Sequence, residues 1–97
     1  MHVGVLQLEL SITDAMSLKD KRRVVLSLKD RIAHGHNVSV AEVDHQDQWQ
    51  RACLGMATVS STPGHAEEIL NEVERFVWSR PDVEVISTER GWLEMES

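Results

Sequence analysis

The densest group of residues that could do chemistry is a run of basic side chains between Ser17 and Arg23, SLKDKRR. Its cations are Lys19, Lys21, Arg22 and Arg23. Helical spacing brings Lys19 and Arg23 together, and a helix that begins here adds free N–H groups and positive dipole character. Such a cluster can bind phosphates, which makes it a candidate nucleic-acid contact. The alternative is a solvated face on which acidic neighbours such as Asp20 and Asp30 neutralise the cations.

A second candidate contact is Trp49, which follows a predicted turn. An exposed indole there could stack on a nucleotide base or pack at a protein interface. The aromatic pair of an RNA-recognition sheet is missing from the strand that follows, where Leu54, Met56 and Thr58 stand in its place. RNA binding would therefore have to depend on the local basic patch of Lys19, Lys21, Arg22 and Arg23, or on a protein partner.

The sequence gives little support for a metal site or for acid–base catalysis. The five histidines are scattered, and the single cysteine provides no zinc-site spacing. Glu42 and Asp44 are expected on one face of a strand, but nothing predicts a cleft that would shift their pKa values apart. No glycine-rich phosphate loop or nucleophile elbow is present in the sequence. We expect no metal, no cofactor and no enzymatic activity.

Length and charge further limit the number of domains and the class of function. The chain has 97 residues and a net charge of -6, which predicts one domain over 1–97 and a poor general nucleic-acid binder. The charge is uneven: residues 1–36 hold six basic and four acidic residues, whereas 37–97 hold four basic and twelve acidic. The lone Cys53 permits no internal disulfide, and no signal peptide or membrane span is evident, so we expect a cytoplasmic protein with Cys53 buried.

Six elements must position these residues. Period-two alternation predicts strands over 2–12, 37–44, 49–60 and 83–95, with Gly91 at a bulge or bend. Helical periodicity and capping signals predict helices over 18–34 and from Pro63 to just before Pro81. The order β-α-β-β-α-β predicts an α+β, ferredoxin-like fold: a four-stranded antiparallel sheet with two helices on one face.

The other face of that sheet should be polar in a monomer, yet several strands carry apolar residues on both faces. The candidate interface residues are Val3, Val5, Leu54, Met56 and Trp92. Contiguous apolar surface usually marks a partner, and tryptophan is enriched at interface centres. This favours a homo-oligomer or a docking surface. The alternative is that strand bulges return these side chains to a single core.

Four segments together resemble the YlxP-like family of small bacterial proteins of unknown function: His2-Val3-Gly4, SLKDKRRVVLSLKDRI, NVSVAEVDHQDQWQRACLG and ATVS. The resemblance covers nearly the whole chain and implies a ferredoxin-like fold and no known catalytic residue. Genes of the family often stand among those for transcription elongation and translation initiation factors, which implies a role near RNA or the ribosome. We therefore expect a non-enzymatic accessory protein that contacts RNA or a ribosomal subunit through its first helix. The alternative is a homodimeric interaction module that uses the open sheet face.

Overall fold

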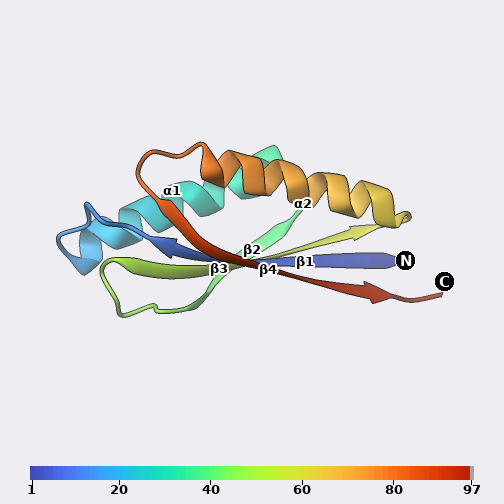
Figure 1. The fold of residues 1–97 in the computed structure, drawn as a ribbon, viewed down its shortest axis with the longest axis horizontal. Coiled ribbons are helices and arrows are strands. Elements are labelled where there is room, and N and C mark those ends of the chain that lie inside the picture. Colours follow the sequence, from blue (N-terminus) through green and yellow to red (C-terminus); the bar gives the residue numbers. More distant parts are fainter. Residues whose placement is uncertain (97) are drawn as a thin grey trace.

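A computed structural model describes residues 1–96 and has the predicted order of elements (Figure 1). They are β1 (His2–Ser11), α1 (Leu18–Gly35), β2 (Ser39–Asp44), β3 (Arg51–Ser60), α2 (Pro63–Trp78) and β4 (Glu84–Glu94). The strands form one sheet in the order β2-β3-β1-β4, and every neighbouring pair is antiparallel. Both helices lie on one side of the sheet, as Figure 1 shows. This arrangement confirms the expected α+β, ferredoxin-like fold.

Local signals account for where the two helices begin. The Ser17 hydroxyl accepts a hydrogen bond from the backbone N–H of Asp20, and the Asp20 carboxylate accepts one from the N–H of Met16. The first bond satisfies a donor that the start of a helix leaves free, and the second fixes the residue before the cap. The Thr62 hydroxyl caps α2 by accepting from the N–H of His65, with Pro63 at the first helical position.

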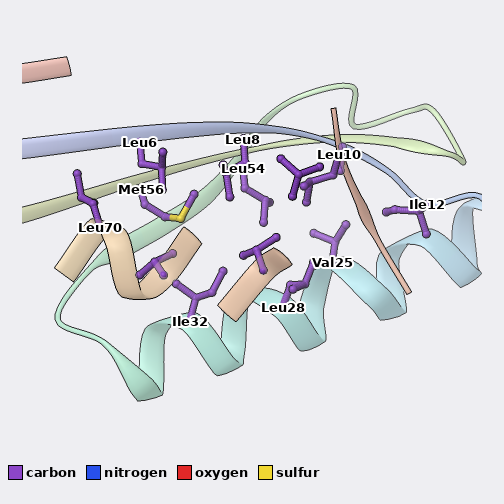
Figure 2. Packing of buried hydrophobic residues seen from close by; sticks show 14 of the residues in the cluster. Leu6, Leu8, Leu10, Ile12, Val25, Leu28, Ile32, Leu54, Met56 and Leu70 are labelled. Carbon is purple, nitrogen blue, oxygen red and sulfur yellow. The ribbon is translucent and has the colours of Figure 1, made fainter. Parts of the chain in front are cut away.

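The hydrophobic core fills the space between the sheet and the two helices (Figure 2). Strand β1 contributes Leu6, Leu8 and Leu10, all at most 1% exposed. Leu54 and Met56 of β3 lie beside them in the same core, so the prediction that these two residues form an interface is wrong. Burial of one such side chain stabilises a fold by about 1.5–3 kcal/mol, and the helix-facing side of the sheet takes the larger residues of β3.

Two bulges decide which residues reach the open face. The register of β2 against β3 shifts between Glu42 and Asp44, and the intervening Val43 lies over Gly55. Glu42 is paired with Leu54 on the helix side and Asp44 with Cys53 on the open side. The two carboxylates are therefore on opposite faces, contrary to expectation, because the extra residue reverses the alternation.

The second bulge lies in β4, opposite the step from Glu9 to Leu10, whereas Gly91 is in regular register with Val5. Gly91 thus marks no bulge. Beyond it, Trp92 pairs with Gly4, and its ring comes within 2.9 Å of where a Gly4 Cβ would be, beside Leu70 of α2. Trp92 therefore sits on the helix side of the sheet, and its predicted place in the open-face interface is wrong.

Candidate nucleic-acid interface

The outward face of α1 carries cations that no carboxylate neutralises. Lys19, Arg22 and Arg23 are exposed, and none of them forms an ion pair with any carboxylate of residues 1–96. Leu26 lies among them on the same outward surface and is also exposed. This surface, defined here as the α1 basic face, comprises Lys19, Arg22, Arg23 and Leu26. It presents positive charge and some apolar area directly to solvent.

Lys21 does not belong to that face. Its side chain is fully buried, with Nζ 2.5 Å from the Glu42 carboxylate and 2.7 Å from the carbonyl oxygen of His45. The prediction that Lys21 contacts RNA is therefore wrong. The helical pattern contained the signal: Lys21 leads the series Val25, Leu28 and Ile32 at i, i+4, i+7 and i+11, which is the buried stripe of α1.

Lys21 also holds the 45–50 loop that joins β2 to β3. Its ammonium donates to the carbonyls of His45 and, at 3.4 Å, Gln46. Within the loop, His45 adopts a left-handed backbone with φ of 64°, and its N–H donates to the Asp44 carboxylate. Asp44 accepts here as aspartate commonly does in turns. The loop thus has a defined conformation that depends on a side chain of α1.

On the open side of the sheet a polar cluster holds the same loop. The Glu9 carboxylate lies 3.0 Å from Nε2 of His45 and accepts a 3.1 Å hydrogen bond from Arg51. Burial by itself raises the pKa of Glu9, but Arg51, Cys53 and His45 outweigh that effect and hold the pKa below its ordinary value of 4.5. Glu9 is therefore ionised at neutral pH and ties β1 to the loop and to β3.

Cys53 lies within this cluster and is fully buried, as predicted. Burial, with the neighbouring Glu9 carboxylate, raises the pKa of the thiol to about 11. A thiol with that pKa is almost entirely protonated at neutral pH, and the thiolate is the nucleophilic form of cysteine. Cys53 therefore has a structural role beside Glu9. Sequence periodicity had indicated its burial but not the polar side chains that cover it.

Trp49 stands at the end of the loop next to the start of α1. It lines a surface depression of about 540 Å³ together with Ala15, Met16, Asp47, Gln48 and Gln50. The side chains of Trp49 and Met16 are 55% and 74% exposed. Met16 immediately precedes the residue that caps α1, so the fold brings Trp49 to the same end of the molecule as the α1 basic face. Sequence analysis did not single out Met16.

The uncovered side of the sheet is apolar over the half away from Glu9. Val3 is half-buried there and Val5 is exposed; Leu93 pairs with Val3, and Val59 lies opposite it on β3. An open groove of about 480 Å³ crosses the centre of the sheet, where small residues such as Gly55, Ala57 and Gly91 line it. The structure thus keeps Val3 and Val5 on the face predicted for an interface, with Val59 and Leu93 in place of Leu54, Met56 and Trp92.

Comparisons of the sequence with known proteins show the family of this chain. Residues 3–90 match the family model described as "Protein of unknown function (DUF503)". The chain is 39% identical over 90 residues to "Uncharacterized protein YlxP" of Bacillus subtilis (strain 168), covering 93% of this chain and 98% of that protein. The chain belongs to the DUF503 family. This confirms the resemblance to YlxP-like proteins that the sequence motifs indicated.

Two solved structures are similar to this chain in fold alone, at 10% identity each. One is the de novo designed protein Foldit4, with a TM-score of 0.54 and coverage of 99% of this chain and 100% of that one. The other is a dimeric ferredoxin-like protein from an uncultured marine organism, with a TM-score of 0.52 and full coverage of both chains. The second supports the ferredoxin-like architecture.

Within the described residues, no three histidine, cysteine, aspartate or glutamate side chains gather where they could hold a metal ion. In the same part of the chain, neither helix is long and apolar enough to cross a bilayer. The features that remain as a candidate site are the α1 basic face, the Trp49 depression beside it, and the apolar part of the open sheet face.

Proposed function

We propose that this protein is a non-enzymatic, cytoplasmic accessory protein that contacts RNA, on or near the ribosome, through the α1 basic face. The observation that carries the proposal is that Lys19, Arg22 and Arg23 are exposed and have no carboxylate partner among residues 1–96. Cations that are already paired gain little from a phosphate, whereas free ones release counterions when they bind it. The net charge of -6 therefore need not prevent a local contact.

The test is the salt dependence of RNA binding. Fluorescence anisotropy with a labelled 12-nucleotide RNA should show an affinity that falls as salt rises. Arg22→Ala/Arg23→Ala should weaken binding at low salt and reduce the slope of log affinity against log salt by about 0.7 for each lost phosphate contact on a single strand. Arg75→Ala is the matched control, because Arg75 is an exposed cation of α2 outside the α1 basic face.

The control variant should bind like the unmodified protein. Equal affinity and equal salt slope in the double variant and the unmodified protein would overturn the proposal, as would a loss of the same size in Arg75→Ala. Circular dichroism of each variant should be unchanged, because all three arginines project into solvent.

Self-association through the open sheet face is a second candidate function, favoured by the exposed Val5, Val59 and Leu93 on that face. Strands β1, β3 and β4 have 10, 10 and 11 residues and β2 has six, so the face is about 33 Å long over three strands and offers part of the roughly 800 Å² per partner of a standard interface. The solved marine ferredoxin-like protein is described as dimeric. We propose that two copies of this chain pack with these faces together.

Light scattering coupled to size exclusion, at high protein concentration, tests the second proposal. The unmodified protein should be a dimer and Val59→Glu a monomer, because a carboxylate would be desolvated at the interface. Leu26→Glu is the control, since Leu26 is about as exposed as Val59 but lies on α1. A monomer in the unmodified protein would rule this candidate out.

A further inference from the structure

The depression around Trp49 is unusual because a well-fixed backbone presents two large apolar side chains to solvent. Trp49 and Met16 both line it and both are more than half exposed. Exposed apolar residues are common singly, but here two of them share one hollow. Its volume of about 540 Å³ lies within the roughly 300–1,000 Å³ of small-molecule sites.

Hydrogen bonds hold both sides of the depression in place. The Gln50 side-chain amide donates to the carbonyls of Thr13 and Ala15, at 3.1 Å each, and the Gln50 carbonyl accepts from Ile12 N–H. These bonds join the 45–50 loop to the segment before α1. From the core side, Lys21 holds the other end of the loop through the carbonyls of His45 and Gln46. The hollow is therefore formed before any ligand arrives, which reduces the ordering cost of binding.

Charge indicates which ligand the hollow fits. Lys19 is three residues beyond Met16, and Arg23 lies one further turn along α1, about 6 Å in rise. A base placed beside Trp49 would leave its sugar-phosphate chain free to run along these cations. Stacking on an indole needs a base face that is not already covered by the neighbouring bases of a helical stack. The ligand is therefore an unpaired nucleotide rather than a regular duplex.

The polar lining adds a preference among bases. Asp47 is exposed at the depression, and a carboxylate there only accepts hydrogen bonds. Guanine presents two adjacent N–H groups on its Watson–Crick edge, whereas uracil, adenine and cytosine each present an acceptor beside a donor. Asp47 therefore favours guanine over the other bases.

From these observations we infer that the Met16–Trp49 depression binds an unpaired guanine of a single-stranded RNA while the α1 basic face holds the adjoining phosphates. The inference rests on the proposed function and names its ligand class. Trp49 supplies the stacking surface, Asp47 the base preference, and Lys19 with Arg23 the path of the backbone.

Binding of three labelled 12-nucleotide RNAs tests the inference: oligo-U, oligo-U with one central guanine, and a fully paired duplex. The single guanine should tighten binding over oligo-U, and the duplex should bind weakest. Trp49→Ala should weaken binding of the guanine-containing strand about tenfold, within the range that base–aromatic stacking supports. Asp47→Asn should lower the guanine preference, measured as the ratio of the affinities for the guanine-containing strand and for oligo-U.

Two further substitutions of Trp49 distinguish aromatic stacking from the effect of side-chain size. Trp49→Leu keeps an apolar side chain without an aromatic face and should behave like Trp49→Ala, whereas Trp49→Phe should retain part of the affinity. Trp78→Ala removes an equally exposed indole from α2 and should change nothing.

The outcomes distinguish the guanine site from the phosphate contact of the α1 basic face. If Trp49→Ala binds all three RNAs like Trp78→Ala while Arg22→Ala/Arg23→Ala still loses affinity, the base site is wrong and the phosphate contact stands. If the duplex binds as tightly as the guanine-containing strand, the base site is also wrong. If no RNA binds at low salt, both proposals fail.

Discussion

The two helices of this DUF503 protein pack against the sheet in the same way on their inner sides but carry opposite charge on their outer sides. Each is capped by a hydroxyl, and each buries a stripe of side chains against the sheet. Apart from the buried Lys21, α1 holds five basic and two acidic residues, whereas α2 holds one basic and four acidic. The core of a ferredoxin-like fold restricts only the inner stripe of a helix, so the outer charges are free to serve binding.

Lys21 is the exception that sharpens this contrast. It is one of the six cations of α1, yet it occupies the inner stripe and pairs with Glu42 of β2. Lys21 contacts Glu42 and the 45–50 loop, whereas Lys19, Arg22 and Arg23 pair with no carboxylate of residues 1–96. Residue type alone thus does not separate a binding cation from a structural one, whereas position on the helix does.

The largest expected effect follows from removing the inner cation. Lys21→Ala leaves the Glu42 carboxylate largely buried without its partner and should lower the free energy of unfolding by about 3 kcal/mol. Lys19→Ala, two residues earlier and on the exposed side of α1, should change the free energy of unfolding by less than about 0.5 kcal/mol. Urea denaturation followed by circular dichroism measures both.

A double variant shows whether the pair itself is responsible. Lys21→Met/Glu42→Leu should recover most of the stability, because both partners become apolar. Equal stability of Lys21→Ala and the unmodified protein would show that Lys21 is not a structural cation.

A smaller effect is expected from reversing charge on the two outer faces. Arg22→Glu/Arg23→Glu should weaken RNA binding at least tenfold at low salt, since repulsion replaces attraction toward phosphate. Glu67→Lys/Glu68→Lys, on the exposed side of α2, adds positive charge away from the proposed site. It should change the affinity less than threefold. A gain in the α2 variant as large as the loss in the α1 variant would mean that binding follows net charge alone.

The smallest expected effect is a loss of folding stability at acidic pH. It comes from Glu9 and Asp82, which do not lie on the outer side of either helix. The pKa of Glu9 is held below 4.5 and that of Asp82, through its hydrogen bonds from Arg80, below 3.8. The folded state therefore favours both ionised forms, a contribution present above these values and lost as pH falls through the lowered ones. Thermal midpoints should drop below about pH 4.5, and Glu9→Gln should show a shallower drop. An identical pH profile for Glu9→Gln would contradict this account of Glu9.

The fold could be predicted from the sequence because its elements carry strong periodic and capping signals. The leucines of β1, the Ser17 cap and Pro63 each act locally, and the βαββαβ order then leaves few arrangements. The exposure of Lys19, Arg22 and Arg23 followed from the same helical period. The prediction for Lys21 is wrong because a run of cations is typical of a solvated face, whereas the helical period places this residue in the buried stripe.

Faces of the sheet were harder to predict. Alternation separates Leu54 and Met56 from Cys53 and Val59 but does not say which set meets the helices. The extra residue Val43 reversed the pattern in β2, and the ring of Trp92 lies over Gly4, a contact between strands far apart in sequence. The Glu9 cluster likewise joins β1, the 45–50 loop and β3, so no local pattern announces it.

The most direct test of the central claim is a two-dimensional ¹H–¹⁵N NMR titration with the guanine-containing single strand. The three tryptophan indole N–H signals report on three regions: Trp49 beside the α1 basic face, Trp78 at the end of α2, and Trp92 on β4. The account predicts shifts in the Trp49 indole and in the backbone of Lys19 to Arg23, with Trp78 and Trp92 unmoved. Shifts confined to Trp78, Trp92 or the open sheet face, or none at all, would contradict it.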